Sequence, residues 1–148
     1  MPSKYAILLL AALCGGACKN TKNNNDVTTN IGASEKDFAD FYEKFHTDSN
    51  YQMAHIVFPL EGLPSGADSA VLASGLFYHQ SADWRMQHSL EDMDKDMDYS
   101  RHLSFLTPDF ARETIYKTDS TYAMERRFAH IDSSWFLIYY AGMNRLQR

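Results

Sequence analysis

The sequence predicts a single α+β domain, in which one N-terminal helix is followed by several short strands. Three observations predict it. The chain has 148 residues, of which 45% are hydrophobic and 14% aromatic, which suits one folded domain and excludes a wholly disordered chain. Apolar residues recur at helical spacing near residue 40, and two long strand-like runs end the chain.

Residues 1–17 are expected to be a signal peptide. Lys4 precedes an apolar run from Tyr5 to Leu13, and small residues then stand directly before Cys18. The run is shorter than the roughly 20 residues that span a bilayer. Cys18 resembles the acylated first residue of bacterial lipoproteins, and the alternative is an ordinary secreted protein with two incidental cysteines, Cys14 and Cys18, in its leader.

Residues 18–33 are expected to form a tether, and residues 34–148 the folded domain. The stretch from Lys19 to Ala33 contains five Asn and few residues that could be buried. Such a tether would hold the domain away from the membrane surface. Because both cysteines precede the domain, it has no disulfide and no cysteine metal site.

A helix is expected from about Glu35 to His46. Ser34 and Asp37 resemble a capping box, and one apolar stripe follows at spacings of three and four residues, formed by Phe38, Phe41, Tyr42 and Phe45. An aromatic stripe at this spacing favours core packing over a ligand site. The cluster Asp48–Asn50 should end the helix, with one further turn possible at 51–53.

Short strands are expected in the middle of the chain. The run His55–Leu60 is β-branched and aromatic, and Pro59 places it near a sheet edge or at a strand end. Residues 76–79 suggest another short strand. Residues 103–106 and 114–117 suggest two more, separated by a turn at 107–109.

The last two strands are expected to form a hairpin, 122–131 with 134–142, joined at Asp132 and Ser133. A two-residue turn places His130 opposite Trp135, Phe128 opposite Leu137, Arg126 opposite Tyr139 and Met124 opposite Ala141. Because the last strand is apolar on both faces, it should lie in the centre of the sheet and be covered.

Residues 38–62 resemble the opening of a family of Gram-negative gut-bacterial lipoproteins of unknown function. The residues that carry the resemblance are Phe38, Phe41, Phe45, Asp48, Tyr51, Gln52, His55, Ile56, Phe58, Pro59 and Leu60, with His55 where the family usually has Arg. Trp84 and the terminal hairpin also fit. The resemblance implies a nuclear-transport-factor-two-like (NTF2-like) fold, in which a helix layer closes a curved antiparallel sheet into a cone.

Motifs for catalysis or metal binding are weak. Asp92, Asp94 and Asp96 mimic the first ligands of a calcium loop, but Met97 replaces the turn glycine and Leu103 the closing glutamate, so a solvated acidic segment is favoured. The six His form no zinc motif, and no nucleophile elbow or phosphate-binding glycine loop occurs. No catalytic residue, metal site or cofactor is therefore predicted.

Arg126 is the strongest candidate for ligand contact, because it would share a sheet face with apolar residues. A buried guanidinium needs a carboxylate, water or an anionic ligand. Pairing with a helix carboxylate, or exposure at an edge, is the structural alternative. Four further candidate pocket walls have aromatic bodies with polar tips: Trp84, Tyr122, His130 and Tyr139.

The charge balance disfavours nucleic acid as a partner. Lys and Arg total 14 and Asp and Glu total 19, and loss of Lys4 with the leader would give 13 − 19 = −6. The sequence predicts an exported, lipid-anchored cell-envelope protein, at the outer membrane or the periplasmic face, that binds a small molecule or a protein without catalysis.

Two alternatives to this function remain. One is an envelope enzyme that uses Tyr139, His130 or Asp residues for acid–base chemistry, which a strongly shifted pKa in the pocket would favour. The other is a homodimer formed through the outer sheet face.

Overall fold

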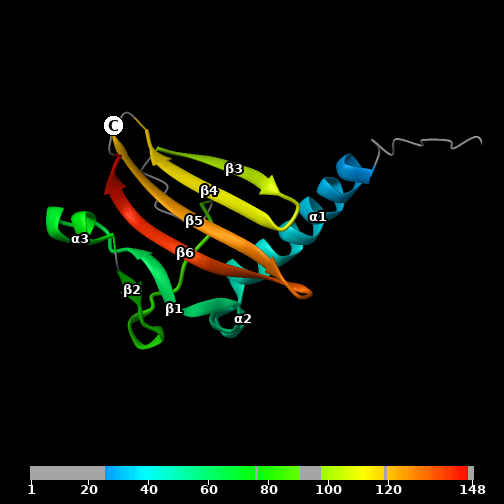
Figure 1. Cartoon of the computed structure of the whole chain (residues 1–148), viewed down its shortest axis with the longest axis horizontal. Coiled ribbons are helices and arrows are strands. Elements are labelled where there is room, and N and C mark those ends of the chain that lie inside the picture. Colours follow the sequence, from blue (N-terminus) through cyan, green and yellow to red (C-terminus); the bar gives the residue numbers. More distant parts are fainter. Residues whose placement is uncertain (1–25, 76, 91–97, 119, 147–148) are drawn as a thin grey trace, which may run out of the picture.

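The protein has the expected α+β class (Figure 1). The structure is a computed structural model that describes residues 26–75, 77–90, 98–118 and 120–146. Its elements in chain order are α1 (Asp26–Thr47), α2 (Ser49–Ala54), β1 (Ile56–Leu63), α3 (Ser69–Ser74), β2 (Tyr78–His79), the 3-10 turn η1 (Ser81–Asp83), β3 (Tyr99–Thr107), β4 (Phe110–Lys117), β5 (Tyr122–Ile131) and β6 (Ser134–Arg145).

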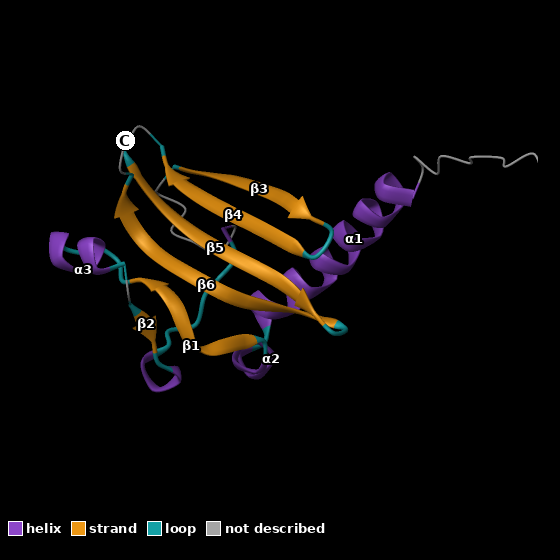
Figure 2. Ribbon diagram, in the orientation of Figure 1, coloured by secondary structure: helices purple, strands orange, loops and turns teal. Residues whose placement is uncertain are grey.

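The strands form one curved sheet in the order β2-β1-β6-β5-β4-β3 (Figure 2). All neighbours pair antiparallel except β1 and β6, which are parallel. The sheet is therefore mixed rather than wholly antiparallel as expected. The reason is topological: the chain leaves β1, builds the β3–β4–β5 meander, and returns beside β1 in the same direction.

Helix α1 covers one face of the sheet, which we call the inner face, and passes behind the strands in Figure 1. Phe38, Phe41 and Phe45 are buried there against Phe128 of β5 and Leu137 of β6. Their rings meet Phe128 largely edge to face, a favourable aromatic geometry. The expectation that the aromatic stripe forms core is confirmed.

The start of α1 differs from the expectation. The helix begins at Asp26 rather than near Glu35, so residues 26–33 are helical and Ser34 is not an N-cap. No proline interrupts residues 26–47, which allows the helix to extend upstream of Ser34.

The end of α1 and the extra turn are confirmed. The Asp48 carboxylate accepts hydrogen bonds from the backbone N–H groups of Asn50 and Tyr51 and so caps α2. Strand β1 follows at Ile56 and lies second from the sheet edge, beside the two-residue β2. Pro59 is thereby near an edge, as predicted.

The other strands are found where the sequence placed them, but most are longer. Strand β3 extends from residue 99 to 107 and β4 from 110 to 117, around the predicted turn. β6 runs three residues beyond Gly142 and lies between β1 and β5, so its central position is confirmed.

The register of the final hairpin follows the expectation only near its turn. His130 pairs with Trp135, and Phe128 with Leu137, as predicted. A bulge between Arg127 and Phe128 then shifts the pairing, so that Tyr140, not Tyr139, lies opposite Arg126. Further along, Glu125 rather than Met124 pairs with Ala141.

Several sequence predictions fall on residues that the structure does not describe. These are the signal peptide, Cys18, the first part of the tether and the acidic triplet Asp92, Asp94 and Asp96. Within the described ranges, no helix is long and apolar enough to cross a bilayer.

Candidate functional site

Arg126 lies on the inner face of β5 with only 1% of its surface exposed. Its Nη1 donates a hydrogen bond of 3.2 Å to Oε2 of Glu113, which faces it from β4 and is fully buried. The partner is thus a strand carboxylate, not the helix carboxylate or exposed edge considered above. This difference arises because β4 begins at Phe110 and therefore includes Glu113 in the sheet.

His46 of α1 contacts the same guanidinium in a fixed tautomer. Arg126 Nη1 lies 2.8 Å from His46 Nε2, and His46 Nδ1 lies 2.8 Å from the carbonyl oxygen of Tyr42. A guanidinium can only donate and a carbonyl can only accept, so Nε2 is the acceptor and Nδ1 carries the proton. Both ring nitrogens are therefore used by the protein itself.

Glu113 accepts hydrogen bonds from three side chains. Besides Arg126, Tyr42 donates its hydroxyl at 2.6 Å and Arg101 of β3 donates its Nε. The guanidinium of Arg101 also lies 4.4 Å above the Tyr42 ring, a cation–π contact. We call these residues the Glu113 network: Tyr42, His46, Arg101, Glu113 and Arg126.

The loop before β3 closes the other side of Arg126. Nη2 donates to the carbonyl oxygen of His88 at 3.3 Å and to Oε1 of Gln87 at 3.4 Å. Arg126 Nε finds no hydrogen-bond partner among the described residues, although it is buried. The guanidinium is therefore held from the helix, the sheet and the loop.

The pKa values in the network move away from neutrality. Burial and the neighbouring Arg126 lower the pKa of His46 to about 4. Burial also raises the pKa of Tyr42, further assisted by Glu113. Burial alone would raise the pKa of Glu113, but Arg126 and the hydrogen bonds from Tyr42 and Arg101 hold it below its usual value.

A groove of about 550 Å³ opens between α1 and β3, and we call it the α1–β3 groove. Both walls carry apolar side chains, Phe38 and Ala39 on the helix and Leu103 and Phe105 on the strand, and the polar residues Glu35, Glu43, Thr47 and Ser89 also line the groove. Tyr42, His46 and Arg101 line its polar part, so the groove borders the Glu113 network. Apolar walls with a few fixed polar groups are typical of small-molecule sites.

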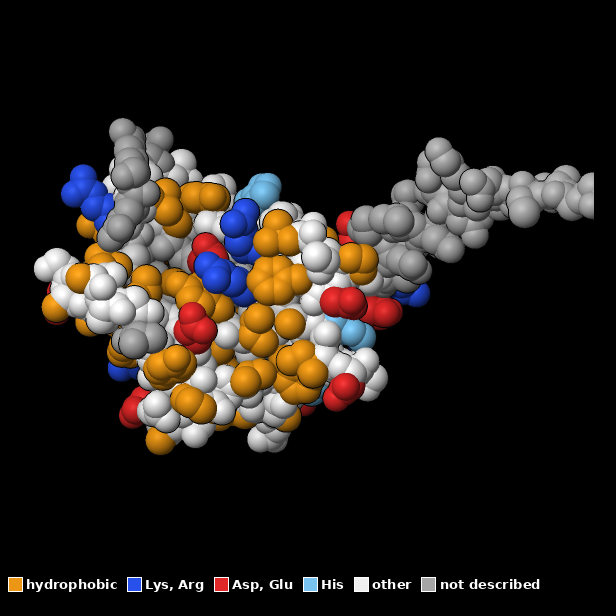
Figure 3. Space-filling model, viewed as in Figure 1, with side chains coloured by type: hydrophobic (Ala, Val, Ile, Leu, Met, Phe, Trp, Pro, Cys, Tyr) orange, Lys and Arg blue, Asp and Glu red, His pale blue; other side chains and the backbone are white. Residues whose placement is uncertain are grey.

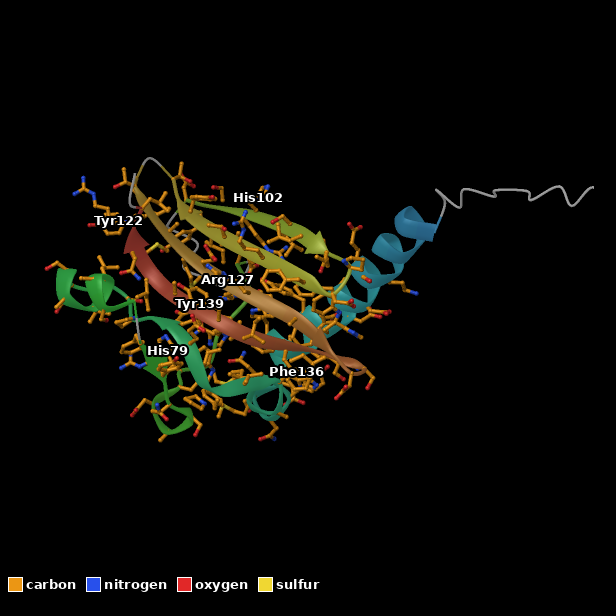
Figure 4. All side chains as sticks on the ribbon, in the orientation of Figure 1. His79, His102, Tyr122, Arg127, Phe136 and Tyr139 are labelled. Carbon is orange, nitrogen blue, oxygen red and sulfur yellow. The ribbon has the colours of Figure 1, made fainter. Side chains whose placement is uncertain are left out.

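The structure does not bring the five predicted pocket residues together. Tyr139 lies on the outer face of the sheet, where Arg127 lies 4.1 Å over its ring (Figure 4), because the bulge places it opposite Arg127. Tyr122 is 43% exposed near the end of the sheet. His130 lies beside Trp135 near Asp109, and Trp84 lines a separate pocket with Tyr140.

The sequence did not identify Glu113, His46 or Arg101 as site residues. It identified Tyr42 only as part of the apolar stripe and not as a polar group of the site. One signal for Glu113 was present: Ala111, Glu113 and Ile115 alternate, which places a carboxylate between two apolar residues on one strand face. For a metal, the described ranges hold no group of three or more His, Cys, Asp or Glu side chains in a ligating arrangement.

The lowered pKa of His46 predicts that the fold loses stability in acid. Because the pKa of His46 is about 4 in the folded state and 6.5 ordinarily, the unfolded chain binds more protons between these values. The free energy of unfolding should therefore fall by about 3 kcal/mol as pH drops from 7 to 4, and Glu113 should add a further loss below its ordinary pKa.

Urea unfolding at a series of pH values measures this loss. His46→Gln should remove most of the slope between pH 6.5 and 4, whereas the exposed His102→Gln should keep it. Equal slopes in all three proteins would contradict the assignment to His46.

Comparison with known proteins supports the fold. No protein-family model matches the sequence, and no curated protein matches it. The crystal structure of a cystatin-like protein from Bacteroides caccae superposes with a TM-score of 0.52 at 18% identity, over 71% of this chain and 74% of that one.

A second match is the crystal structure of an NTF2-like protein from Bacteroides fragilis, with a TM-score of 0.50 at 16% identity. The match covers 74% of this chain but 47% of that chain, so it spans about half of that protein's length. At these identities the likeness shows the fold alone. The chain therefore has the fold of NTF2-like and cystatin-like proteins, as the resemblance of residues 38–62 implied. Because this fold serves many functions, the site must decide the function.

Proposed function

We propose that this chain is a lipid-anchored cell-envelope protein whose domain binds a small organic molecule in the α1–β3 groove without chemical change. The proposal includes the resemblance to gut-bacterial lipoproteins, a signal peptide that is removed before Cys18, and export to the envelope. The observation that carries it is a groove with apolar side chains on both its helix and its strand wall, beside a polar network whose groups already bind one another.

The network does contain strongly shifted pKa values, the feature that would favour the acid–base enzyme, but the direction of the shifts supports that alternative less well. A catalytic acid or base works best with a pKa near the ambient pH. Here the shifts run the other way: His46 stays neutral, Glu113 stays ionised and Tyr42 keeps its proton at neutral pH. His46 Nε2, the unprotonated nitrogen of its ring, is also occupied by Arg126. The network suits shaping and polarising a binding surface.

The groove can be tested by filling it from the helix. Ala39 is exposed on α1 and lines the groove, so Ala39→Trp should occupy the space without entering the core. The probe is 2-naphthol, an aromatic body with one hydroxyl group. We expect it to shift the backbone NMR signals of Leu103 and Phe105 in the full-length protein, and Ala39→Trp to weaken binding by about tenfold or more.

Lys36→Trp is the matched control, because Lys36 is exposed on the same helix but does not line the groove. It should bind 2-naphthol as the wild type does. Binding that survives Ala39→Trp unchanged, or naphthol-induced shifts that avoid β3, would refute the groove as the binding site.

The anchor is tested by a pair of cysteine variants expressed as the full chain in a Gram-negative host. Cys18→Ser should abolish incorporation of an alkyne-labelled fatty acid and release the protein from the membrane fraction, because a multiply acylated cysteine provides the stable anchoring. Cys14→Ser should remain labelled, since Cys14 lies inside the proposed leader. Labelling that persists in Cys18→Ser would reject this residue as the anchor.

A homodimer formed through the outer face of the sheet is the second candidate function. Figure 3 shows apolar side chains on this face around a few basic and acidic ones, and Val57, Tyr116 and Ile131 are exposed. Exposed apolar surface of this kind favours association. A strictly monomeric protein in sedimentation at high concentration would exclude the homodimer and leave the groove proposal intact.

A further inference from the structure

A second pocket of about 470 Å³ lies between β6 and the segment that follows β2, and we call it the Trp84 pocket. The side chains that matter here are His79, Asp83, Trp84, Arg85, Gln87 and Tyr140. No residue lining it also lines the α1–β3 groove. It is therefore a separate site, and nothing in the function proposed above uses it.

Three aromatic rings form one wall at steep mutual angles. The rings of Trp84 and Tyr140 lie 5.2 Å apart at 79°, and those of Trp84 and His79 lie 5.8 Å apart at 84°. His79 and Tyr140 lie 5.2 Å apart at 64°. The three rings therefore pack edge to face on one another, and all three line the pocket.

The rings are held in place before any ligand arrives. Trp84 Nε1 donates to Oε1 of Gln52 at 3.1 Å, and Phe58 packs against the Trp84 indole at 76°. His79 Nε2 lies 3.1 Å from the carbonyl oxygen of Tyr140. His79 belongs to β2, the strand at the edge of the sheet, and is labelled in Figure 4. A wall fixed in this way loses little conformational freedom on binding.

Polar groups of opposite kinds line the same pocket. Asp83 offers only acceptors and Arg85 only donors, and both side chains are exposed. The negative charge of Asp83 and the positive charge of Arg85 cancel, so the two side chains add no net charge to the pocket. Behind them, Gln87 accepts a hydrogen bond from the buried Arg126, whose charge is paired with Glu113. The pocket therefore presents no net charge, which favours a neutral ligand over a cation.

We propose that the Trp84 pocket binds a neutral sugar ring. A pyranose has a face of C–H groups, which packs on the negative faces of aromatic rings. It also has a rim of hydroxyl groups, each of which donates and accepts hydrogen bonds. The pocket supplies both requirements side by side: the Trp84 and Tyr140 surfaces for the ring face, and Asp83 and Arg85 for the hydroxyl groups.

The test uses three neutral oligosaccharides with different linkages and substituents: maltohexaose, cellohexaose and chitohexaose. At least one should shift the indole N–H signal of Trp84 in NMR spectra of the full-length protein, in a saturable way. Sorbitol, which carries hydroxyl groups but no ring, should leave that signal in place at equal concentration. Choline serves as the cationic probe and should not bind.

The test uses substitutions of two exposed residues, because replacing Trp84 would also remove its hydrogen bond to Gln52. Asp83→Ala and Arg85→Ala should each weaken binding of the bound oligosaccharide by about tenfold. Arg112→Ala, an exposed change on β4, is the matched control and should bind as the wild type does.

Failure of all three oligosaccharides to bind would overturn the proposal, and so would choline binding in their place. Binding that is unchanged in both Asp83→Ala and Arg85→Ala would also overturn it. Since Ala39→Trp in the α1–β3 groove leaves this pocket untouched, the result is independent of the groove experiment.

Discussion

Replacing Glu113 by glutamine is expected to lower the free energy of unfolding by about 3–5 kcal/mol. The substitution keeps the size of the side chain but removes the charge that faces Arg126, whose guanidinium is 1% exposed. A buried guanidinium without its carboxylate bears the cost of desolvation with little compensation. Urea unfolding at pH 7 measures the loss.

The outer face provides a matched control for this prediction. Glu125 and Arg127 form an ion pair of the same residue types, but their side chains are 27% and 41% exposed. Glu125→Gln should therefore cost at most about 1 kcal/mol. In addition, Glu113→Leu combined with Arg126→Met should be more stable than Glu113→Leu alone, because no buried charge is left unpaired. Similar losses for Glu113→Gln and Glu125→Gln would contradict the described network.

Gly62→Ala is expected to cost about 3 kcal/mol or more, because added volume in a packed site forces the backbone to move. A Cβ on Gly62 would lie 1.7 Å from the carbonyl oxygen of Tyr140. Because this oxygen belongs to the backbone of the neighbouring strand β6, β1 and β6 would have to separate at the point where Gly62 pairs with Tyr140. Thermal and urea unfolding should both report the loss.

Gly66→Ala separates crowding from backbone strain. Gly66 has φ of +65° and no atom within 4 Å of an added Cβ, so only the conformational cost of about 1 kcal/mol applies. A loss for Gly62→Ala no greater than that for Gly66→Ala would mean that the close approach of β1 and β6 does not constrain the fold.

The parts of the fold that depend on local pattern could be predicted from the sequence. The stripe Phe38, Phe41 and Phe45 predicted the buried side of α1, and the Asp132–Ser133 turn predicted the final hairpin. The parallel pairing of β1 with β6 could not be predicted, because it joins segments about eighty residues apart. The bulge after Arg127 leaves no clear sequence signal, and it alone moved Tyr139 to the outer face.

The candidate site was predictable only in its central residue. Arg126 was identified because a guanidinium between Met124 and Phe128 on one strand face needs a partner. Its partner was missed because this strand was predicted to start at Thr114, one residue after Glu113, whereas β4 begins at Phe110. His46 and Arg101 reach the network only through tertiary packing of α1 and β3, which no local spacing reveals.

The central claim is that the groups of the network beside the α1–β3 groove are held in place by one another, and that the network therefore serves binding rather than proton transfer. The most direct test is a pH titration of the His46 ring in ¹⁵N-labelled full-length protein, followed by two-dimensional NMR. We expect a neutral ring protonated on Nδ1 at pH 7, with a pKa of about 4. A His46 pKa at or above its ordinary 6.5, or a proton on Nε2, would contradict the account and favour the acid–base enzyme.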